Sequence, residues 1–181
     1  MNQELINNNY LVLQNLINKD KAIEIAHSFV HYCDACHIGP DFQVEKSQAL
    51  GNYLPIMEIL CDKVSFLNSV IEEPLFPTYA FARSYKHGAI LKRHRDRPAC
   101  EISVTLNLYS EHDWPICIET PDGREVCITQ KPGDGMLYLG HTADHWRDEK
   151  PDDSLFVQCF LHYVRSRGPY SWAIFDKEVR Y

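Results

Sequence analysis

Two stretches in the first half of the chain space their apolar residues as an amphipathic helix does. The first covers residues 21–36, with an apolar stripe formed by Ile23, Ile25, Ala26, Phe29 and Val30. The second covers residues 52–71, with Ile56, Ile59, Leu60, Val64 and Leu67 in equivalent places. Residues 18–20 (Asn-Lys-Asp) supply capping side chains before the first stretch. The sequence therefore predicts two helices, and Pro74 and Pro77 end the helical region.

From residue 78 onward the pattern changes to closely spaced strands. Strands are expected at 78–85, 89–95, 101–109, 115–119, 124–130, 135–139 and 155–164, and a short earlier strand in 10–16. Asp122-Gly123 is a strong hairpin signal between two of them, and Asp134 in "KPGDG" reads as a turn residue. Helices followed by many strands predict a mainly β protein of the α+β class, a sandwich or barrel with helices packed outside.

Length and composition fit one globular domain over residues 1–181. Helical support is expected over about 1–73, a β core over about 74–165 and a C-terminal extension over 166–181. No run of about 18 apolar residues is present, so no membrane span is expected. The start of the chain lacks the basic and apolar regions of a signal peptide. With seven cysteines, an odd number, a cytoplasmic protein with free thiols is the simplest expectation.

The net charge of −7 does not favour nucleic acid as a partner. Basic residues are nevertheless concentrated in one segment, as Lys86, Lys92, Arg93, Arg95 and Arg97. This basic cluster has two interpretations. It attracts an anionic substrate through its local field, or it is a solvated strand face.

The basic cluster surrounds a His-x-Asp pair, His94 and Asp96, and a further histidine, His145, lies far downstream. In a strand, residues i and i+2 point to the same side, so His94 and Asp96 are expected to face inward while Arg93, Arg95 and Arg97 face outward. Two imidazoles and one carboxylate form the facial triad that binds ferrous iron. Taken alone, the pair fits a surface pair on a charged strand better than a metal site.

The segments "RSYKHGAILKRHRDR" and "KPGDGMLYLGHTADHW" together resemble the Fe(II)/2-oxoglutarate-dependent dioxygenases, especially the prolyl 4-hydroxylase-like branch. The matching pieces are a tyrosine before a glycine-containing turn, the His-x-Asp pair, a Pro-Gly-Asp turn and a distal histidine, within about residues 78–164. The resemblance implies a double-stranded β-helix (jelly-roll, cupin-like) core. It also implies Fe(II), with 2-oxoglutarate and O2 as co-substrates. The reaction implied is hydroxylation of a C–H bond of a peptide side chain or small molecule, with release of succinate and CO2.

The same resemblance assigns roles to individual residues. His94, Asp96 and His145 are the implied metal ligands, with His141 as a rival for the distal position. Tyr85 matches a tyrosine that donates a hydrogen bond to 2-oxoglutarate, and Arg83 lies on the same strand face. The family usually holds the far carboxylate with an Arg or Lys some nine to seventeen residues after the distal histidine. This chain has none in that span, so the candidates are Arg147 first, then Arg83, then His162.

Several other readings stay open. The protein is alternatively a cupin-like metalloenzyme that uses iron without 2-oxoglutarate, or a non-catalytic binding or sensor protein on the same fold. Cys33, Cys36 and His37 formally match haem or zinc patterns, but a helix end with partly buried thiols is favoured. The remaining cysteines are expected to be small apolar core residues: Cys61, Cys100, Cys117, Cys127 and Cys159. Trp114 and Trp146 either stack on a substrate or pack in the core.

Overall fold

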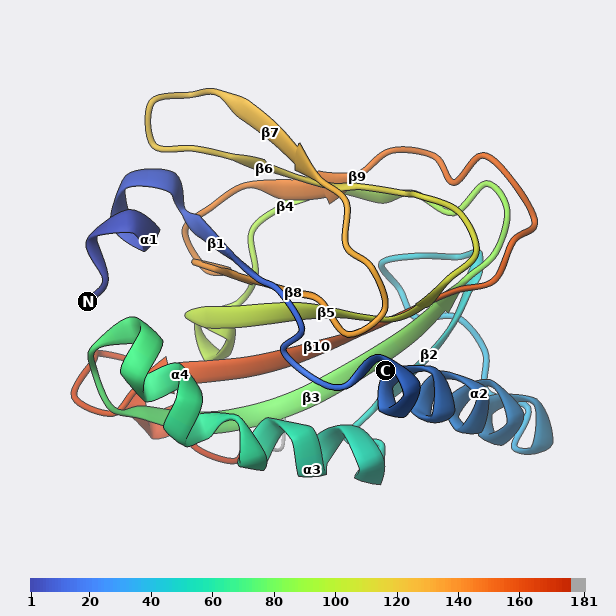
Figure 1. Ribbon diagram of the computed structural model, residues 1–181, viewed down its shortest axis with the longest axis horizontal. Helices are drawn as coiled ribbons and strands as arrows, with labels where there is room; N and C mark the ends of the chain where they lie inside the picture. Colours follow the sequence, from blue (N-terminus) through green and yellow to red (C-terminus); the bar gives the residue numbers. More distant parts are fainter. Residues whose placement is uncertain (177–181) are drawn as a thin grey trace.

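The computed structural model describes residues 1–176 and consists of a helical layer and two antiparallel sheets (Figure 1). The larger sheet has the strand order β1-β8-β5-β10-β3-β2, and the smaller one β4-β9-β6-β7. The strands are β1 (Tyr10–Leu13), β2 (Ser47–Gly51), β3 (Leu75–Tyr85), β4 (Leu91–His94), β5 (Ile102–Ser110), β6 (Ile116–Glu119), β7 (Glu125–Ile128), β8 (Gly135–Tyr138), β9 (His145–Arg147) and β10 (Phe156–Arg165). The helices are α1 (Gln3–Asn8), α2 (Lys19–Ala35), α3 (Leu54–Asp62) and α4 (Val64–Ile71), with 3-10 turns at Pro98–Cys100 and Ser171–Ala173.

Helices α2, α3 and α4 cover the outer face of the larger sheet, and the smaller sheet lies over its other face (Figure 1). The main core is therefore the helix–sheet interface, where Ile25 and Phe29 of α2 belong to one buried cluster with Val104, Leu106 and Leu161. The expected order of helices first and strands afterwards is correct. Two facing antiparallel sheets of this kind form the expected double-stranded β-helix, or jelly-roll, core.

Helix α2 begins where the sequence predicts, because the Asn18 side chain accepts hydrogen bonds from the backbone N–H groups of Asp20 and Lys21. The second expected helix is instead two helices, α3 and α4, divided at Lys63. Helix α1 and the strands β2 and β9 were not expected from the sequence pattern. Strand β9 has three residues and β2 reads Ser-Gln-Ala-Leu-Gly, and neither shows a strong apolar alternation.

The expectation that the remaining cysteines are small core residues is wrong for Cys61, Cys117 and Cys127. Cys117 and Cys127 form a disulfide, because β6 and β7 pair in a hairpin that places these two residues directly opposite each other, with Cα atoms 4.0 Å apart. Cys61 is exposed on α3 and is not a core residue. Cys100 and Cys159 are free and buried, as expected. Within residues 1–176, no helix combines the length and apolar character that a bilayer crossing requires.

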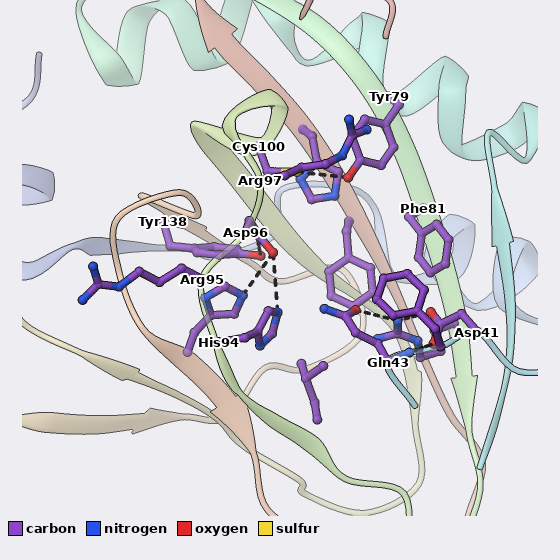
Figure 2. Close-up of a pocket in the computed structure, with 16 residues that line it drawn as sticks. Asp41, Gln43, Tyr79, Phe81, His94, Arg95, Asp96, Arg97, Cys100 and Tyr138 are labelled. Atoms are coloured by element: carbon purple, nitrogen blue, oxygen red, sulfur yellow. Dashed lines mark hydrogen bonds and ion pairs between the residues drawn. The ribbon is translucent and has the colours of Figure 1, made fainter. Parts of the chain in front are cut away.

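A cavity of about 420 Å³ opens between the two sheets (Figure 2). Its walls come from β3, β8 and β10 of the larger sheet and from β4 and β9 of the smaller one, with the segment 41–43 at one side. The fold therefore brings side chains separated by more than a hundred positions to one space, and the candidate site is built on these walls.

Candidate metal centre

His94 is the last residue of β4 and His145 the first of β9, and they lie opposite each other in the antiparallel ladder. Their ring centroids are 4.3 Å apart. Asp96 lies two residues beyond the end of β4, so strand alternation does not set its direction. Its backbone N–H instead donates to the carbonyl of Gly140 at 2.8 Å, which fixes the chain at this position.

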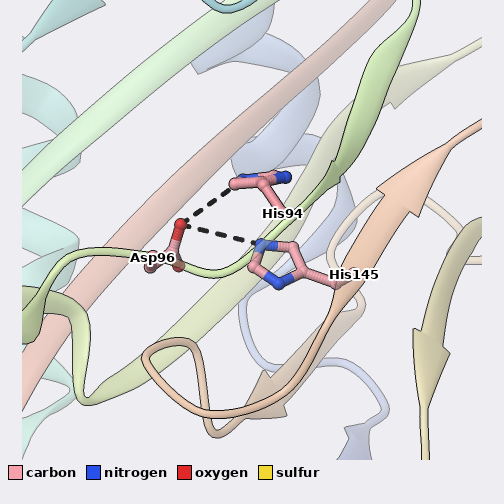
Figure 3. Close-up of side chains that lie close together, drawn as sticks. All are labelled: His94, Asp96 and His145. Carbon is pink, nitrogen blue, oxygen red and sulfur yellow. Dashed lines mark ion pairs between the residues drawn. The ribbon is translucent and has the colours of Figure 1, made fainter.

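The three side chains converge on one point (Figure 3). Oδ1 of Asp96 lies 3.5 Å from Nε2 of His94 and 3.7 Å from Nε2 of His145. Nδ1 of His94 lies 2.8 Å from the carbonyl of Lys92, and Nδ1 of His145 lies 3.0 Å from that of Ala143. A carbonyl can only accept, so each Nδ1 carries the hydrogen and each Nε2 keeps its lone pair for a metal. The donor set fits a divalent cation bound on one face.

The other carboxylate oxygen of Asp96 is held away from this point. Oδ2 accepts from the Tyr138 hydroxyl at 3.4 Å and from Ser103 Oγ at 3.5 Å. Gly140 is required beside it, because a Cβ at this position would lie 2.6 Å from Oδ2 of Asp96. Sequence reasoning missed Tyr138, Ser103 and Gly140 as supporting residues. Their role depends on strand pairing, so no local signal could have found them.

The electrostatics keep Asp96 ionised. Burial alone would raise the pKa of Asp96, but His145, His94 and His162 together bring it below its ordinary value. The pKa of His94 is raised, since the hydrogen bond and charge of Asp96 outweigh the lowering by burial. The pKa of His145 is lowered, mainly by burial. Metal binding needs an ionised carboxylate and neutral imidazoles, so a bound cation would displace the proton that Asp96 favours on His94.

His141, the rival for the distal position, lies outside the cluster. Its Nδ1 is 2.9 Å from the backbone carbonyl of Asp96 and its ring packs against Tyr170. It therefore supports the Asp96 backbone, while the structure brings His145 to the shared point. Figure 3 shows this arrangement of His94, Asp96 and His145.

A second group, Asp96 with Cys100 and His162, also has ligand atoms within 4.8 Å of one another. Burial raises the pKa of Cys100 well above its ordinary value, so its thiol stays protonated and is a poor ligand. Its sulfur lies 3.0 Å from the Tyr79 hydroxyl. His162 is neutral, because burial lowers its pKa to about 4, and its Nδ1 is bonded to Ser103 Oγ at 2.8 Å. The protonated Cys100 thiol, and not the state of His162, makes the first group the better metal site.

The basic cluster does not face outward as a whole, which corrects the expectation. Arg97 is half-buried and lines the cavity, since the regular strand ends at His94 and a 3-10 turn follows at Pro98–Cys100 (Figure 2). Arg95 borders the cavity but is exposed. Arg93 does face outward and lies over the Trp146 ring at 4.4 Å. Lys86 and Lys92 are exposed, in keeping with a solvated strand face.

Among the candidates for 2-oxoglutarate binding, Arg83 and His162 line the cavity. Arg83 is buried and already engaged. Its Nη2 forms an ion pair with Asp41 and donates to Gln43 Oε1 at 3.0 Å, and its Nη1 donates to the Tyr85 hydroxyl at 3.2 Å. The Asp41 contact joins residues 42 positions apart, so the sequence did not reveal it.

Tyr85 and Arg147 are not among the cavity-lining residues. The Arg147 side chain is inward-facing and 1% exposed, with its guanidinium 4.9 Å from the ring centroids of both Trp114 and Phe156. Nη1 donates to the Trp114 carbonyl, and Nε has no partner. Within residues 1–176 no carboxylate pairs with Arg147, and burial lowers its pKa to about 10. It is therefore a buried cation without an anion.

The other sequence-based candidates have structural roles. Cys33 is buried and Cys36 exposed at the end of α2, and neither belongs to a metal-capable group among the described residues. Asp134 accepts from the backbone N–H groups of Asn15 and Lys131, as a turn residue does. Trp114 packs in the buried cluster beside the cavity.

Comparisons with known proteins agree with this architecture. Neither a protein-family model nor a curated protein matches the sequence. Solved structures do match. A Pseudomonas putida prolyl-4-hydroxylase has a TM-score of 0.69 at 15% identity, covering 88% of this chain and 95% of that one. HygX from Streptomyces hygroscopicus, with nickel and 2-oxoglutarate bound, has a TM-score of 0.69 at 10% identity over 92% and 88% of the two chains.

A third match is a Trichoplax adhaerens prolyl hydroxylase, in complex with a peptide fragment of the hypoxia inducible factor oxygen degradation domain. Its TM-score is 0.71 at 11% identity, and the alignment covers 88% of this chain and 86% of that one. At such identities the similarity establishes the fold. The resemblance seen in the sequence is thus confirmed at the level of architecture, and this chain has the double-stranded β-helix fold of the Fe(II)/2-oxoglutarate-dependent oxygenases.

Proposed function

We propose that this protein is an Fe(II)- and 2-oxoglutarate-dependent oxygenase that hydroxylates a C–H bond of a peptide side chain or small molecule, releasing succinate and CO2. The observation that carries the proposal is the convergence of two Nε2 lone pairs and one carboxylate oxygen on the wall of a cavity. His94, Asp96 and His145 hold the metal. The nickel and 2-oxoglutarate bound by HygX, a protein of similar fold, support a metal ion and 2-oxoglutarate as the cofactors of this site.

A bound ferrous ion with 2-oxoglutarate supplies the activation of dioxygen. The protein's own residues bind and orient these groups and limit their access to water. His94, Asp96 and His145 would hold the ion from one wall of the cavity, so that a co-substrate could reach it from the cavity. Tyr138 and Ser103 hold Oδ2 of Asp96, so that Oδ1 stays turned to the metal. His145 is buried and Asp96 half-buried between the sheets, which limits the access of bulk water to the ligands.

Arg147 is the residue we assign to the far carboxylate of 2-oxoglutarate, with the Tyr85 hydroxyl as a neighbouring donor. Arg147 and His145 share one face of β9, and residues i and i+2 of a strand lie roughly 7 Å apart, about the length of 2-oxoglutarate. A buried cation without a counter-ion is costly, and a bound carboxylate removes that cost. Arg83 and His162 are weaker candidates, because Asp41 already neutralises Arg83 and His162 is uncharged.

The test uses the whole protein with Fe(II) and 2-oxoglutarate. Without oxygen, the two together should give a visible metal-to-ligand absorption band, and with oxygen they should give succinate even without substrate. Asp96→Ala should abolish both signals, while Asp122→Ala, which removes an exposed carboxylate in the β6–β7 turn, should leave both unchanged. Succinate formation by Asp96→Ala at the wild-type rate would overturn the ligand assignment.

The same measurements separate the alternatives. A cupin-like metalloenzyme that works without 2-oxoglutarate is favoured by one observation, namely that Tyr85 and Arg147 lie off the cavity walls. It would bind Fe(II) without any absorption band on addition of 2-oxoglutarate. A non-catalytic protein on this fold would bind no ferrous ion at all.

A further inference from the structure

The arginines that line the cavity each have a carboxylate of their own. Arg83 pairs with Asp41, Arg95 with Asp144 at 3.0 Å, and Arg97 with Asp176 at 2.5 Å. Only Asp41 of these acids lines the cavity; the other two approach from outside it. The arginines on the cavity walls therefore present no unneutralised positive charge to a ligand.

The charges of the metal centre also cancel, if the proposed function holds. A ferrous ion and the Arg147 guanidinium are balanced by the Asp96 carboxylate and the two carboxylates of 2-oxoglutarate. The histidines on the cavity walls add no positive charge in this scheme. His94 and His145 are neutral when they bind the metal, and the hydrogen bond of His162 Nδ1 goes to the Ser103 hydroxyl and not to a carboxylate that would hold a second proton on the ring. The part of the cavity left for a substrate is electrically neutral.

The wall on the Arg83 side is also apolar. Phe81 and Phe160 stand next to each other with ring centroids 6.5 Å apart, and both rings lie against the Arg83 guanidinium, at 5.3 Å and 5.7 Å. Leu91 extends this wall toward His94. Figure 2 shows Phe81 on this side, away from the group of Tyr79, Arg97 and Cys100.

Phe42 is the unusual residue of this wall. It lines the cavity and yet is 76% exposed. Its two neighbours, Asp41 and Gln43, are both bonded to Arg83, so the backbone on either side of Phe42 is tied to β3. Covering this exposed ring with an apolar group of a ligand would remove apolar surface from water and so favour binding.

We propose that the substrate inserts an uncharged, apolar group into this cavity and that Phe42 covers the group at the mouth. A charged group would lose its hydration without gaining a free partner, which disfavours it strongly. This proposal deepens the proposed function, on which it rests, and it replaces the sequence-based idea that the basic cluster attracts an anion. Phe42 is a specificity-determining residue in this scheme.

The test uses the protein with 2-oxoglutarate and with Mn(II) in place of Fe(II), so that no turnover occurs. Three probes of similar size are compared by the relaxation that Mn(II) induces in their protons: N-acetyl-leucinamide, the α-amide of N-acetyl-aspartate, and N-acetyl-lysinamide. We expect the leucine probe to bind at least about tenfold more tightly than either charged probe, which corresponds to about 1.4 kcal/mol. A pentapeptide with a central leucine between glycines separates the two sources of such a group. Tighter binding of the pentapeptide indicates a peptide substrate, and weaker binding indicates a small molecule.

Two variants test whether Phe42 contributes to the binding of the leucine probe. Phe42→Ser should weaken binding of the leucine probe several-fold while leaving the affinity for Mn(II) unchanged. Phe66→Ser, which removes an exposed phenylalanine on α4, should change neither. Equal or tighter binding of a charged probe, no relaxation of any probe, or full binding by Phe42→Ser would each overturn the proposal. Failure of the proposed function gives a result that can be distinguished from these. In that case Mn(II) itself would not bind, and no succinate would form with Fe(II).

Discussion

Replacing Arg147 by methionine removes the buried cation and keeps most of its apolar stem. Burial lowers the pKa of Arg147 from its ordinary value to about 10, and at 1.36 kcal/mol per pH unit this corresponds to roughly 3 kcal/mol of destabilisation of the folded state. The folded state binds this proton less tightly than the unfolded one, so the full cost is present below pH 10 and disappears as the pH rises above 10 toward the pKa of the unfolded state. At pH 7 the ligand-free Arg147→Met protein should therefore be at least as stable as the wild type.

Affinity for 2-oxoglutarate should move in the opposite direction. Removing one partner of a buried charge pair costs about 2–5 kcal/mol, so a loss of about 3 kcal/mol, or roughly a hundredfold in Kd, is expected. Anaerobic titration of the Fe(II) protein with 2-oxoglutarate, followed by the absorption band, measures this affinity, and thermal unfolding of the metal-free protein measures stability. Arg124→Met, at an exposed arginine paired with Asp122, is the matched control and should change neither quantity.

The combination of the two results identifies the role of Arg147. Weaker 2-oxoglutarate binding with unchanged or higher stability shows that the guanidinium serves the ligand. Unchanged 2-oxoglutarate affinity in Arg147→Met would refute the assignment, and a loss of affinity in Arg83→Met instead would move the role to that residue. A large loss of stability in Arg147→Met would show that its bond to the Trp114 carbonyl outweighs the cost of burial.

Other predictions concern the support of the site and of the fold. Gly140→Ala should lower Fe(II) affinity at least about tenfold and also lower the Tm, because the added Cβ would meet Oδ2 of Asp96 and the Cys100 backbone carbonyl, each at 2.6 Å. Gly39→Ala, where nothing lies within 4 Å of the added Cβ, is its control. Tyr138→Phe should lower Fe(II) affinity by about tenfold, measured by competition with a chelator, and an unchanged affinity would mean that the hydroxyl does not orient Asp96. Reduction of the Cys117–Cys127 disulfide should destabilise the protein by about 2 kcal/mol and lower the Tm by several degrees, and reductant should have no such effect on Cys117→Ser.

Much of the protein is determined by local features of the sequence. The helix cap at Asn18 and the apolar stripe after it place α2, because capping and helical spacing act within a few residues. Strand alternation and the Asp122-Gly123 turn place the β6–β7 hairpin. The candidate metal ligands were also selected at the sequence level, where His94 and Asp96 form a His-x-Asp pair and the resemblance to the oxygenase family favours His145 over His141.

Only the tertiary structure decided how these residues face one another. Alternation is defined relative to a strand, and β4 ends at His94, so the inward direction of Asp96 comes from the Gly140 carbonyl and that of Arg97 from the turn beyond. Asp41 neutralises Arg83, and no carboxylate among the described residues pairs with Arg147. Both facts depend on which segments of the chain become neighbours in the fold. Strand pairing is a long-range choice made by packing and hydrogen bonding across the whole chain, and no local pattern of hydrophobic residues records it.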